Sequence, residues 1–259
     1  MQQRETMRVA TWNVNSVRVR ILQIIEFIVE YDIDVILLQE LKCVTEAFPY
    51  ECIEDAGYSC AVYGQKTYNG VAIISRHLID DIKLGSSIFL GDPSSRYIEA
   101  FINGFRIASV YVPNGGTDPS LEPYRYKLNF IRTFTDYLQT EIASDKFIIG
   151  GDFNVAREDI DVYDPRLWRD KVCCTPAERE AFQNLIDIGL VDIYRTTHAA
   201  KEGYTWWDYR QDSVSKNRGL RIDYILSTKG VNFKGVTVQR GVRTNPRPSD
   251  HAPVVVDVC

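Results

Sequence analysis

Short apolar runs alternate along this chain with longer segments in which apolar residues recur at helical spacing. Apolar runs of about four to eight residues, bounded by turn residues, are typical of strands. Asn103-Gly104, between two such runs, predicts a hairpin turn. The predicted strands span residues 8–14, 34–38, 71–75, 97–102, 106–112, 147–151, 221–227 and 253–258.

Helices are predicted between these strands. Residues 124–140 and 176–188 have the spacing of helices, and Pro176 suits a first helical turn. Another helix follows Ser16, which is expected to cap its N-terminus. The apolar positions of that helix are Val17, Ile21, Ile24, Ile25 and Ile28. Residues 205–219 are polar and aromatic and are expected to form a loop.

Strands that spread through the whole chain, with helices between them, predict one α/β domain rather than two domains. Its expected bounds are residues 8–259, with residues 1–7 as a short extension. The 259 residues are 45% hydrophobic and 25% charged, so a core can form without disulfide staples. No apolar run approaches a membrane span and residues 1–6 are too polar for a signal peptide, so no membrane partner is expected.

The cysteines and the net charge bear on compartment and partner. None of the six cysteines lies in a C-x-x-C pair, which favours a reduced, cytoplasmic setting. The adjacent Cys173 and Cys174 are expected to be packing or surface residues. A net charge of −5 argues against a nucleic-acid partner. It does not exclude one, because a bound divalent cation offsets part of the charge of clustered carboxylates.

Polar residues fall at or just beyond the ends of the apolar strands. Folds of the α/β class gather their sites at strand ends along one sheet edge. Carboxylates that meet there repel one another, and a divalent cation relieves this repulsion. The residues at these strand ends are Asn13, Glu40, Tyr111, Asn114, Asp152, Asn154, Asp223, Asp250 and His251.

Several of these positions also have a simpler interpretation. Asp152 and Asn154, on one side of a strand end, offer hard oxygen ligands for magnesium or manganese. However, Gly, Asp and Asn are also common turn residues. Glu40 is either a metal ligand at the end of a strand or a solvated surface glutamate. Tyr111 either bonds a phosphate or lies at the rim of the core.

Asp223 lies inside an apolar strand, where a carboxylate needs a partner. His251 would be one, because the carboxylate would fix its tautomer and favour its charged form. The alternative is a salt bridge to Arg218 or Arg221. Asp250 before His251 is also consistent with a turn that carries a buried histidine.

Residues 206–210 (WWDYR) place exposed aromatic side chains beside an arginine. Such a segment suits stacking on a base or filling a gap in a duplex. A small satellite core under the loop is the alternative.

Together, these motifs resemble the exonuclease III family of DNA-repair nucleases, within the endonuclease/exonuclease/phosphatase superfamily. They occur in the family's order from near residue 8 to the C-terminus. The matching segments are residues 10–16 (ATWNVNS), 38–40 (LQE), 68–73 (YNGVAI), 111–115 (YVPNG), 151–156 (GDFNVA), 159–165 (DIDVYDP), 219–223 (GLRID) and 247–253 (RPSDHAP).

The resemblance implies a four-layer α/β sandwich, in which two mixed β-sheets pack face to face and are flanked by helices. Glu40 resembles the family's principal metal ligand, Asp152 the residue that activates water or protonates the leaving group, and Asn154 the phosphate-binding residue. The implied catalytic set is Tyr111, Asp152, Asn154, Asp223 and His251. The implied metal set is Asn13, Glu40, Asp152, Asn154, Asp250 and His251, with Mg²⁺ as cofactor and Mn²⁺ as substitute. The expected DNA contacts are Asn114, Trp206, Arg210, Arg221 and His251.

The implied activity is hydrolysis of DNA phosphodiester bonds by a monomer. It would cleave 5′ to abasic sites, or remove 3′ nucleotides or blocking groups from duplex DNA. A phosphatase of inositol or sphingolipid head groups is an alternative, against which the Trp206 loop and the Asp223 segment argue. A module that binds damaged DNA without cutting is another, which would not need every candidate catalytic residue. Leu41, Asn15 and the strip 168–171 depart from relatives, and the strip bears on substrate preference.

Overall fold

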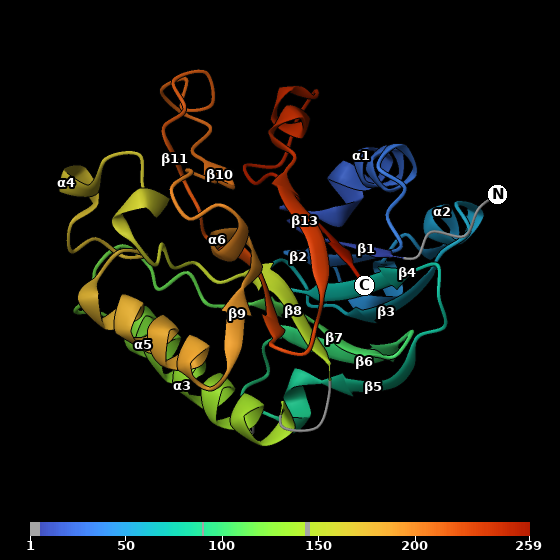
Figure 1. The fold of residues 1–259 in the computed structure, drawn as a ribbon. Helices are drawn as coiled ribbons and strands as arrows, with labels where there is room; N and C mark the ends of the chain where they lie inside the picture. Colours follow the sequence, from blue (N-terminus) through green and yellow to red (C-terminus); the bar gives the residue numbers. More distant parts are fainter. Residues whose placement is uncertain (1–5, 90, 143–145) are drawn as a thin grey trace.

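The computed structural model describes residues 6–89, 91–142 and 146–259 and contains two mixed six-stranded sheets (Figure 1). In the first, the order β13-β14-β1-β2-β4-β3 comprises Phe233–Val238, Val254–Val258, Met7–Asn13, Val35–Gln39, Val71–Ser75 and Ser59–Tyr63. In the second, the order β5-β6-β7-β8-β12-β9 comprises Asp80–Leu84, Tyr97–Ile102, Phe105–Tyr111, Phe147–Asp152, Asp223–Thr228 and Leu190–Asp192. Both sheets are mixed because β1 pairs parallel with β2, and β7 with β8, among antiparallel neighbours.

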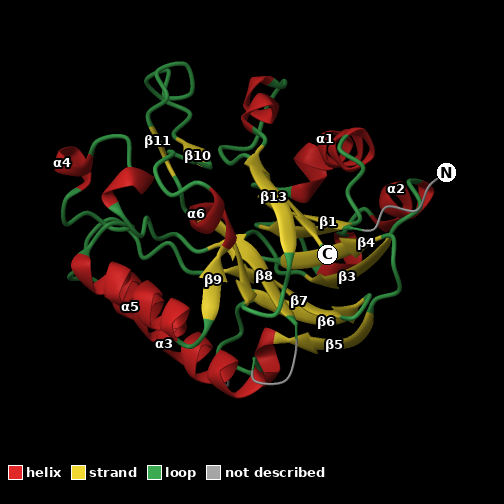
Figure 2. Cartoon of the chain, in the orientation of Figure 1, coloured by secondary structure: helices red, strands yellow, loops and turns green. Residues whose placement is uncertain are grey.

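Helices cover the outer faces of both sheets (Figure 2). The α-helices are α1 (Val17–Glu30), α2 (Tyr50–Asp55), α3 (Glu122–Glu141), α4 (Pro165–Trp168), α5 (Pro176–Asp187) and α6 (Ile193–Thr197). The 3-10 turns are Thr45–Ala47, Gly85–Ser87, Asp159–Asp161 and Arg240–Thr244. A short two-stranded sheet joins β10 (Trp206–Trp207) to β11 (Gly219–Leu220).

Alternation along the strands divides the apolar side chains among separate core layers. Val9 and Leu37 point between the sheets and share a core with Ile148 of the second sheet. Their neighbours face outward: Ala10 of β1 lies in the cluster that includes Phe27 of α1. Phenylalanines of α3 and α5 cover the other outer face in the same way. The predicted four-layer α/β sandwich is confirmed.

The strand boundaries agree with the apolar runs to within about two residues. The edge strands β3, β5, β9 and β13 were not predicted, and the loop predicted over residues 205–219 contains β10 and the first residue of β11. Of the predicted extension, residues 1–5 lie outside the described residues, and β1 begins at Met7.

The prediction that Ser16 caps α1 with its side chain is wrong. Ser16 occupies the N-cap position with a φ of 98°, and its side chain makes no capping hydrogen bond. Its backbone N–H instead donates to the carbonyl oxygen of Glu40 at 2.8 Å. This bond holds the first turn of α1 against the end of β2. The backbone of Ser16 therefore connects the helix to the strand end, and its side chain does not cap the helix.

A buried polar bridge joins the two sheets below this strand end. The amide nitrogen of Gln39 donates to the hydroxyls of Thr11 and Ser109, each at 3.0 Å. The sheets approach closely here, since a Cβ added to Gly150 would lie 2.6 Å from a methyl carbon of Leu37. The ends of β2, β7 and β8 are therefore held in fixed relative positions.

No helix of the described residues is long and apolar enough to cross a membrane.

Candidate active site

A pocket of about 460 Å³ opens where β2, β7 and β8 end. It gathers most of the polar strand-end residues predicted from the sequence, and adds aromatic and aliphatic side chains from the loops beyond them. Its lining residues are Glu40, Tyr111, Asn114, Gly116, Thr117, Asp152, Asn154, Trp168, Lys171, Val172, Cys173, Trp206, Leu220, Ile222, Asp250 and His251.

Asp223 and His251 form the predicted buried pair. Nδ1 of His251 lies 2.8 Å from Oδ2 of Asp223. Thr205 donates its hydroxyl to the same carboxylate at 2.5 Å, and this hydroxyl accepts the N–H of Asp223. Burial lowers the pKa of His251, but Asp223 and Asp152 outweigh it and raise the pKa to about 10. The imidazole is therefore a fixed cation at the base of the pocket.

Asp152 is the most deeply placed carboxylate of the pocket, with 1% of its surface exposed. Its Oδ2 accepts the amide N–H of Asn13 at 2.9 Å and lies 3.7 Å from Nε2 of His251. Its Oδ1 accepts the backbone N–H of Asn154 at 2.9 Å. Burial raises the pKa of Asp152 to about 7, against the lowering effect of His251. A carboxyl group with such a pKa is suited to proton transfer near neutral pH.

Glu40 offers a carboxylate oxygen as a metal ligand, and Asn13 orients that carboxylate. Nδ2 of Asn13 donates to Oε1 of Glu40 at 2.9 Å as well as to Asp152, so it ties the two carboxylates together. Lys42 lies 2.8 Å from the other oxygen of Glu40. Burial raises the pKa of Glu40, but Lys42 and Asn13 lower it below its ordinary value. Glu40 is thus a carboxylate paired with a cation that a metal ion could displace.

Two arrangements in the pocket could hold a divalent ion. Asp152, Asp223 and His251 offer ligand atoms within 4.8 Å of one another. A protonated imidazole has no lone pair for a metal, and the pKa of His251 is raised to about 10. The carboxylates of Glu40, Asp152 and Asp250 line the same pocket. Among the described residues these three carboxylates do not form a cluster as compact as the first. Magnesium keeps several waters and is usually bound through one or two carboxylates, so Glu40 and Asp152, which Asn13 ties together, remain candidate ligands.

Three residues in the loops that carry these side chains have a left-handed backbone conformation. Glu40, Lys42 and Asn154 have φ values of 54°, 55° and 52°. Non-glycine residues adopt this region rarely, and it persists where surrounding contacts fix the backbone. The side-chain amide of Asn154 donates to the carbonyl of Val112 at 3.0 Å, and its oxygen accepts Asn114 at 3.2 Å. The predicted phosphate-binding residue is therefore held rigidly.

Tyr111 and the predicted aromatic residue Trp206 lie on the walls of the pocket. Burial, with Glu40 and Asp152 nearby, raises the pKa of Tyr111, so its hydroxyl stays protonated and can donate. The indole N–H of Trp206 donates to Asp250 at 3.0 Å. Trp168 meets Trp206 edge to face, with ring centroids 6.5 Å apart. Asp250, for which the sequence also allowed a turn, thus orients an aromatic wall.

The two predicted DNA-binding arginines lie outside the pocket lining. Arg210 is exposed and forms an ion pair with Asp208 at 2.8 Å. Arg221 is 1% exposed and bonds Asp161 at 2.6 Å and Asp192 at 2.9 Å. The prediction that Arg221 contacts DNA is wrong, because its guanidinium group is enclosed and makes four hydrogen bonds to Asp161 and Asp192. The alternative that Asp223 pairs with Arg221 is wrong for the same reason.

Arg221→Met is expected to lower the free energy of unfolding by about 3 kcal/mol, because it removes the buried cation that the two carboxylates share and leaves them only their ion pairs with Arg195 and Arg157. Urea denaturation followed by circular dichroism measures the change. Arg210→Met is the matched control and should leave the midpoint nearly unchanged, since its ion pair is exposed. Equal midpoints for both variants would contradict a structural role for Arg221.

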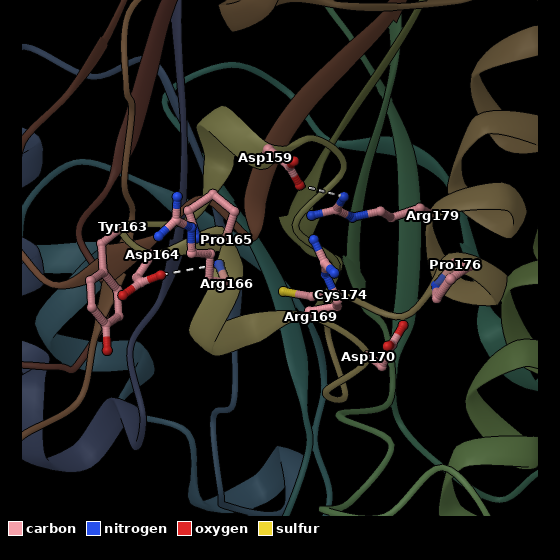
Figure 3. A pocket seen from close by; sticks show the side chains of 10 residues that line it. All are labelled: Asp159, Tyr163, Asp164, Pro165, Arg166, Arg169, Asp170, Cys174, Pro176 and Arg179. Atoms are coloured by element: carbon pink, nitrogen blue, oxygen red, sulfur yellow. Dashed lines mark hydrogen bonds and ion pairs between the residues drawn. The ribbon is translucent and has the colours of Figure 1, made fainter.

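A second and larger pocket, of about 810 Å³, is lined by Arg169 and Asp170 (Figure 3), which lie in sequence between Trp168 and Lys171 of the first pocket. Arg179 turns toward Asp159 there, at 2.8 Å, and the carboxylate of Asp164 caps α4 (Figure 3). Cys174 lines this pocket, whereas its neighbour Cys173 lines the first. The larger pocket contains none of the predicted site residues.

Comparison with known proteins agrees with this geometry. Residues 10–251 match the model of the Endonuclease/Exonuclease/phosphatase family. The chain belongs to this family. It is 34% identical over 262 residues to exodeoxyribonuclease III of Haemophilus influenzae, a match that covers 96% of this chain and 98% of that protein.

Solved structures of the same family superpose closely on the fold. The 3′ phosphatase NExo from Neisseria, bound to a product DNA hairpin, gives a TM-score of 0.94 at 39% identity, covering 96% of this chain and 98% of that chain. An AP endonuclease from Archaeoglobus fulgidus gives 0.91 at 32% identity, with the same coverage. The resemblance to the exonuclease III family, stated from sequence, is confirmed.

Sequence reasoning missed several residues of this family member's pocket. Thr205 holds Asp223 from an aromatic segment that looked like a loop. Trp168 and Lys171 belong to the strip 168–171, which the sequence linked to substrate preference without placing it in the pocket. Cys173, expected to be a packing or surface residue, also lines the pocket.

Proposed function

We propose that this chain is a Mg²⁺-dependent DNA-repair phosphodiesterase. It cleaves 5′ to abasic sites, or removes 3′ nucleotides or 3′-blocking groups from duplex DNA. The observation that carries the proposal is one pocket holding Glu40, Asp152 and a charged His251 beside the aromatic wall of Trp206. The product DNA hairpin bound to the Neisseria relative supports a DNA substrate.

Mg²⁺ bound by Glu40, with Asp152 and Asp250 nearby, would neutralise charge on the phosphoryl oxygens. Asp152 accepts a proton from the attacking water as the P–O bond to the 3′ oxygen breaks, and the departing 3′ oxygen takes a proton from solvent. The products are a 5′-phosphate and a 3′-hydroxyl. The mechanism assigns the proton to Asp152 because its pKa is raised to about 7 and it lies at the base of the pocket.

The remaining side chains stabilise charge on the phosphate. His251 donates from Nε2, and Asp223 keeps it protonated and aimed. Asn154 has one amide N–H left for a phosphate oxygen, since the other bonds Val112. The hydroxyl of Tyr111, which bonds Glu40 in this structure, would turn to donate to a second oxygen. Fixed donors of this kind act where negative charge develops, without reorganising during the reaction.

Asn114 and Trp206 line the pocket and are proposed to contact the sugar and bases beside the cleaved bond. Arg210 is exposed on the loop after Trp206 and is proposed to meet the DNA backbone. We further propose a monomer in a reducing, cytoplasmic compartment, which the six free cysteines favour.

A comparison of three duplexes tests the proposed function: one with an internal abasic site, one with a recessed 3′ end and one with a 3′-blocked nick. At least one should be hydrolysed in Mg²⁺, the reaction should stop in excess chelator, and Mg²⁺ or Mn²⁺ should restore it. Denaturing gels that resolve the 5′-phosphate and 3′-hydroxyl products measure the result. No turnover of any duplex in either metal, or equal turnover in chelator, would contradict the proposal.

A further inference from the structure

A fully buried ion pair lies behind the pocket segments that carry Asn114, Asn154 and Cys173. Lys127 of α3 and Glu178 of α5 are both 0% exposed, and Nζ of Lys127 donates to Oε1 of Glu178. Neither residue lines the pocket. Replacing a buried ion pair by apolar side chains is often neutral or stabilising, so stability alone is a weak reason for this pair.

The ammonium group of Lys127 bonds the backbone of two pocket residues as well as Glu178. It donates to the carbonyl oxygen of Asn154 at 2.6 Å and to that of Asn114 at 3.2 Å, in addition to Glu178. These three acceptors use all three donors of an ammonium group. Asn114 and Asn154 are the pocket residues whose side-chain amides bond one another. Lys127 thus fixes both main chains from the side opposite the substrate.

Glu178 extends the connection to a third wall of the pocket. Its Oε1 also accepts the backbone N–H of Cys173 at 3.0 Å, and its Oε2 accepts that of Thr175 at 3.1 Å. Cys173 lines the pocket with a φ of 76°, an uncommon conformation that depends on such contacts. The pair therefore links the segments around Asn114, Asn154 and Cys173.

The aliphatic part of the Lys127 side chain packs closely against the loop that contains Gly115. A Cβ added to Gly115 would lie 2.9 Å from Cδ of Lys127. The loop after Tyr111 therefore rests on the lysine side chain, and its position depends on both shape and charge.

We propose that Lys127, with Glu178, is a positioning residue for the phosphate site. It sets the relative places of residues 112–117, 153–156 and 172–175 and touches no substrate atom. The expected effect of Lys127 on catalysis rests on the proposed function. Its expected effect on the positions of the three loops rests on the observed contacts alone.

Lys127→Met tests it, since methionine keeps much of the side-chain volume and removes the charge. We expect kcat on the best duplex substrate to fall about 100-fold, the size of effect that a misplacement of about 1 Å produces. KM should change little, because Lys127 touches no substrate.

The matched control is Glu99→Gln, which alters another fully buried carboxylate, outside the pocket and bonded to Tyr97 and Tyr137. Hydrogen exchange followed by mass spectrometry should show faster exchange in residues 112–117, 153–156 and 172–175 of Lys127→Met. The control should leave those segments unchanged. Glu178→Gln should change kcat and hydrogen exchange in the same direction as Lys127→Met, but by a smaller amount. This variant replaces Lys127→Met in the test if the methionine variant does not fold.

Two results would overturn the inference. One is wild-type kcat and wild-type exchange in the three segments of a folded Lys127 or Glu178 variant. The other is equal loss of kcat in Glu99→Gln, which would reduce the effect to general destabilisation. An inactive wild-type protein would count against the proposed function alone, because the exchange comparison still decides the positioning role.

Discussion

Asp152→Asn is expected to lower kcat on the DNA substrate by about 10³- to 10⁴-fold, while the protein still folds and binds DNA. Asparagine has nearly the same shape and can keep one hydrogen bond from Asn13 or from the backbone of Asn154. It cannot accept the proton of the attacking water. Its amide N–H groups would also face the charged imidazole of His251, 3.7 Å from the present carboxylate oxygen.

Single-turnover rates on an end-labelled duplex measure this change, and a gel-shift titration in Ca²⁺ measures DNA binding separately. Asp159→Asn is the control, since Asp159 pairs with Arg179 in the other pocket and makes no contact with this site. An Asp152→Asn rate within about tenfold of wild type would assign the proton to another group, because loss of general base catalysis alone costs more.

The fold was predictable where strands are buried on both faces. Every residue of β2 and of β4 is buried, and such strands read as short continuous apolar runs. The missed strands lie at or near sheet edges or are very short. Asp80–Leu84 of β5 carries three charged residues, and β13 has a register shift between Phe233 and Val236. Edge strands are often charged and bulged, which removes the apolar signal.

The site was predictable as a set of strand ends, but less so residue by residue. Asp223 and His251 met as predicted because a buried carboxylate requires a partner. Arg221 was misassigned because its acidic partners are distant in sequence: Asp161 is 60 residues away and Asp192 is 29 residues away. No local pattern reports contacts of that range. The same holds for Lys127 and Glu178, which look in the sequence like ordinary charges on two helices.

Glu40→Gln is expected to raise the Mg²⁺ concentration needed for activity and to lower kcat/KM by about 10²- to 10³-fold at a fixed low Mg²⁺ concentration. The amide keeps one oxygen for Asn13 but loses the charge that attracts a divalent cation. Calorimetric titration with Mn²⁺ measures ion binding without depending on turnover. Asp152→Asn should weaken that binding less than Glu40→Gln does, if Glu40 is the principal ligand.

Lys42→Met is expected to change the affinity for Mn²⁺ in the opposite direction to Glu40→Gln. Lys42 lies 2.8 Å from Oε2 of Glu40 and competes with a cation for the same oxygen, so its removal should tighten Mn²⁺ binding. Unchanged metal binding in Glu40→Gln would instead place the ion at Asp152, Asp223 and His251, whose ligand atoms lie within 4.8 Å of one another. An ion there requires a neutral imidazole, so Asp223→Asn would then weaken Mn²⁺ binding where the Glu40 site predicts little change. The two possible ion sites therefore make opposite predictions for Mn²⁺ binding by Glu40→Gln and by Asp223→Asn. One series of titrations on these two variants distinguishes the sites.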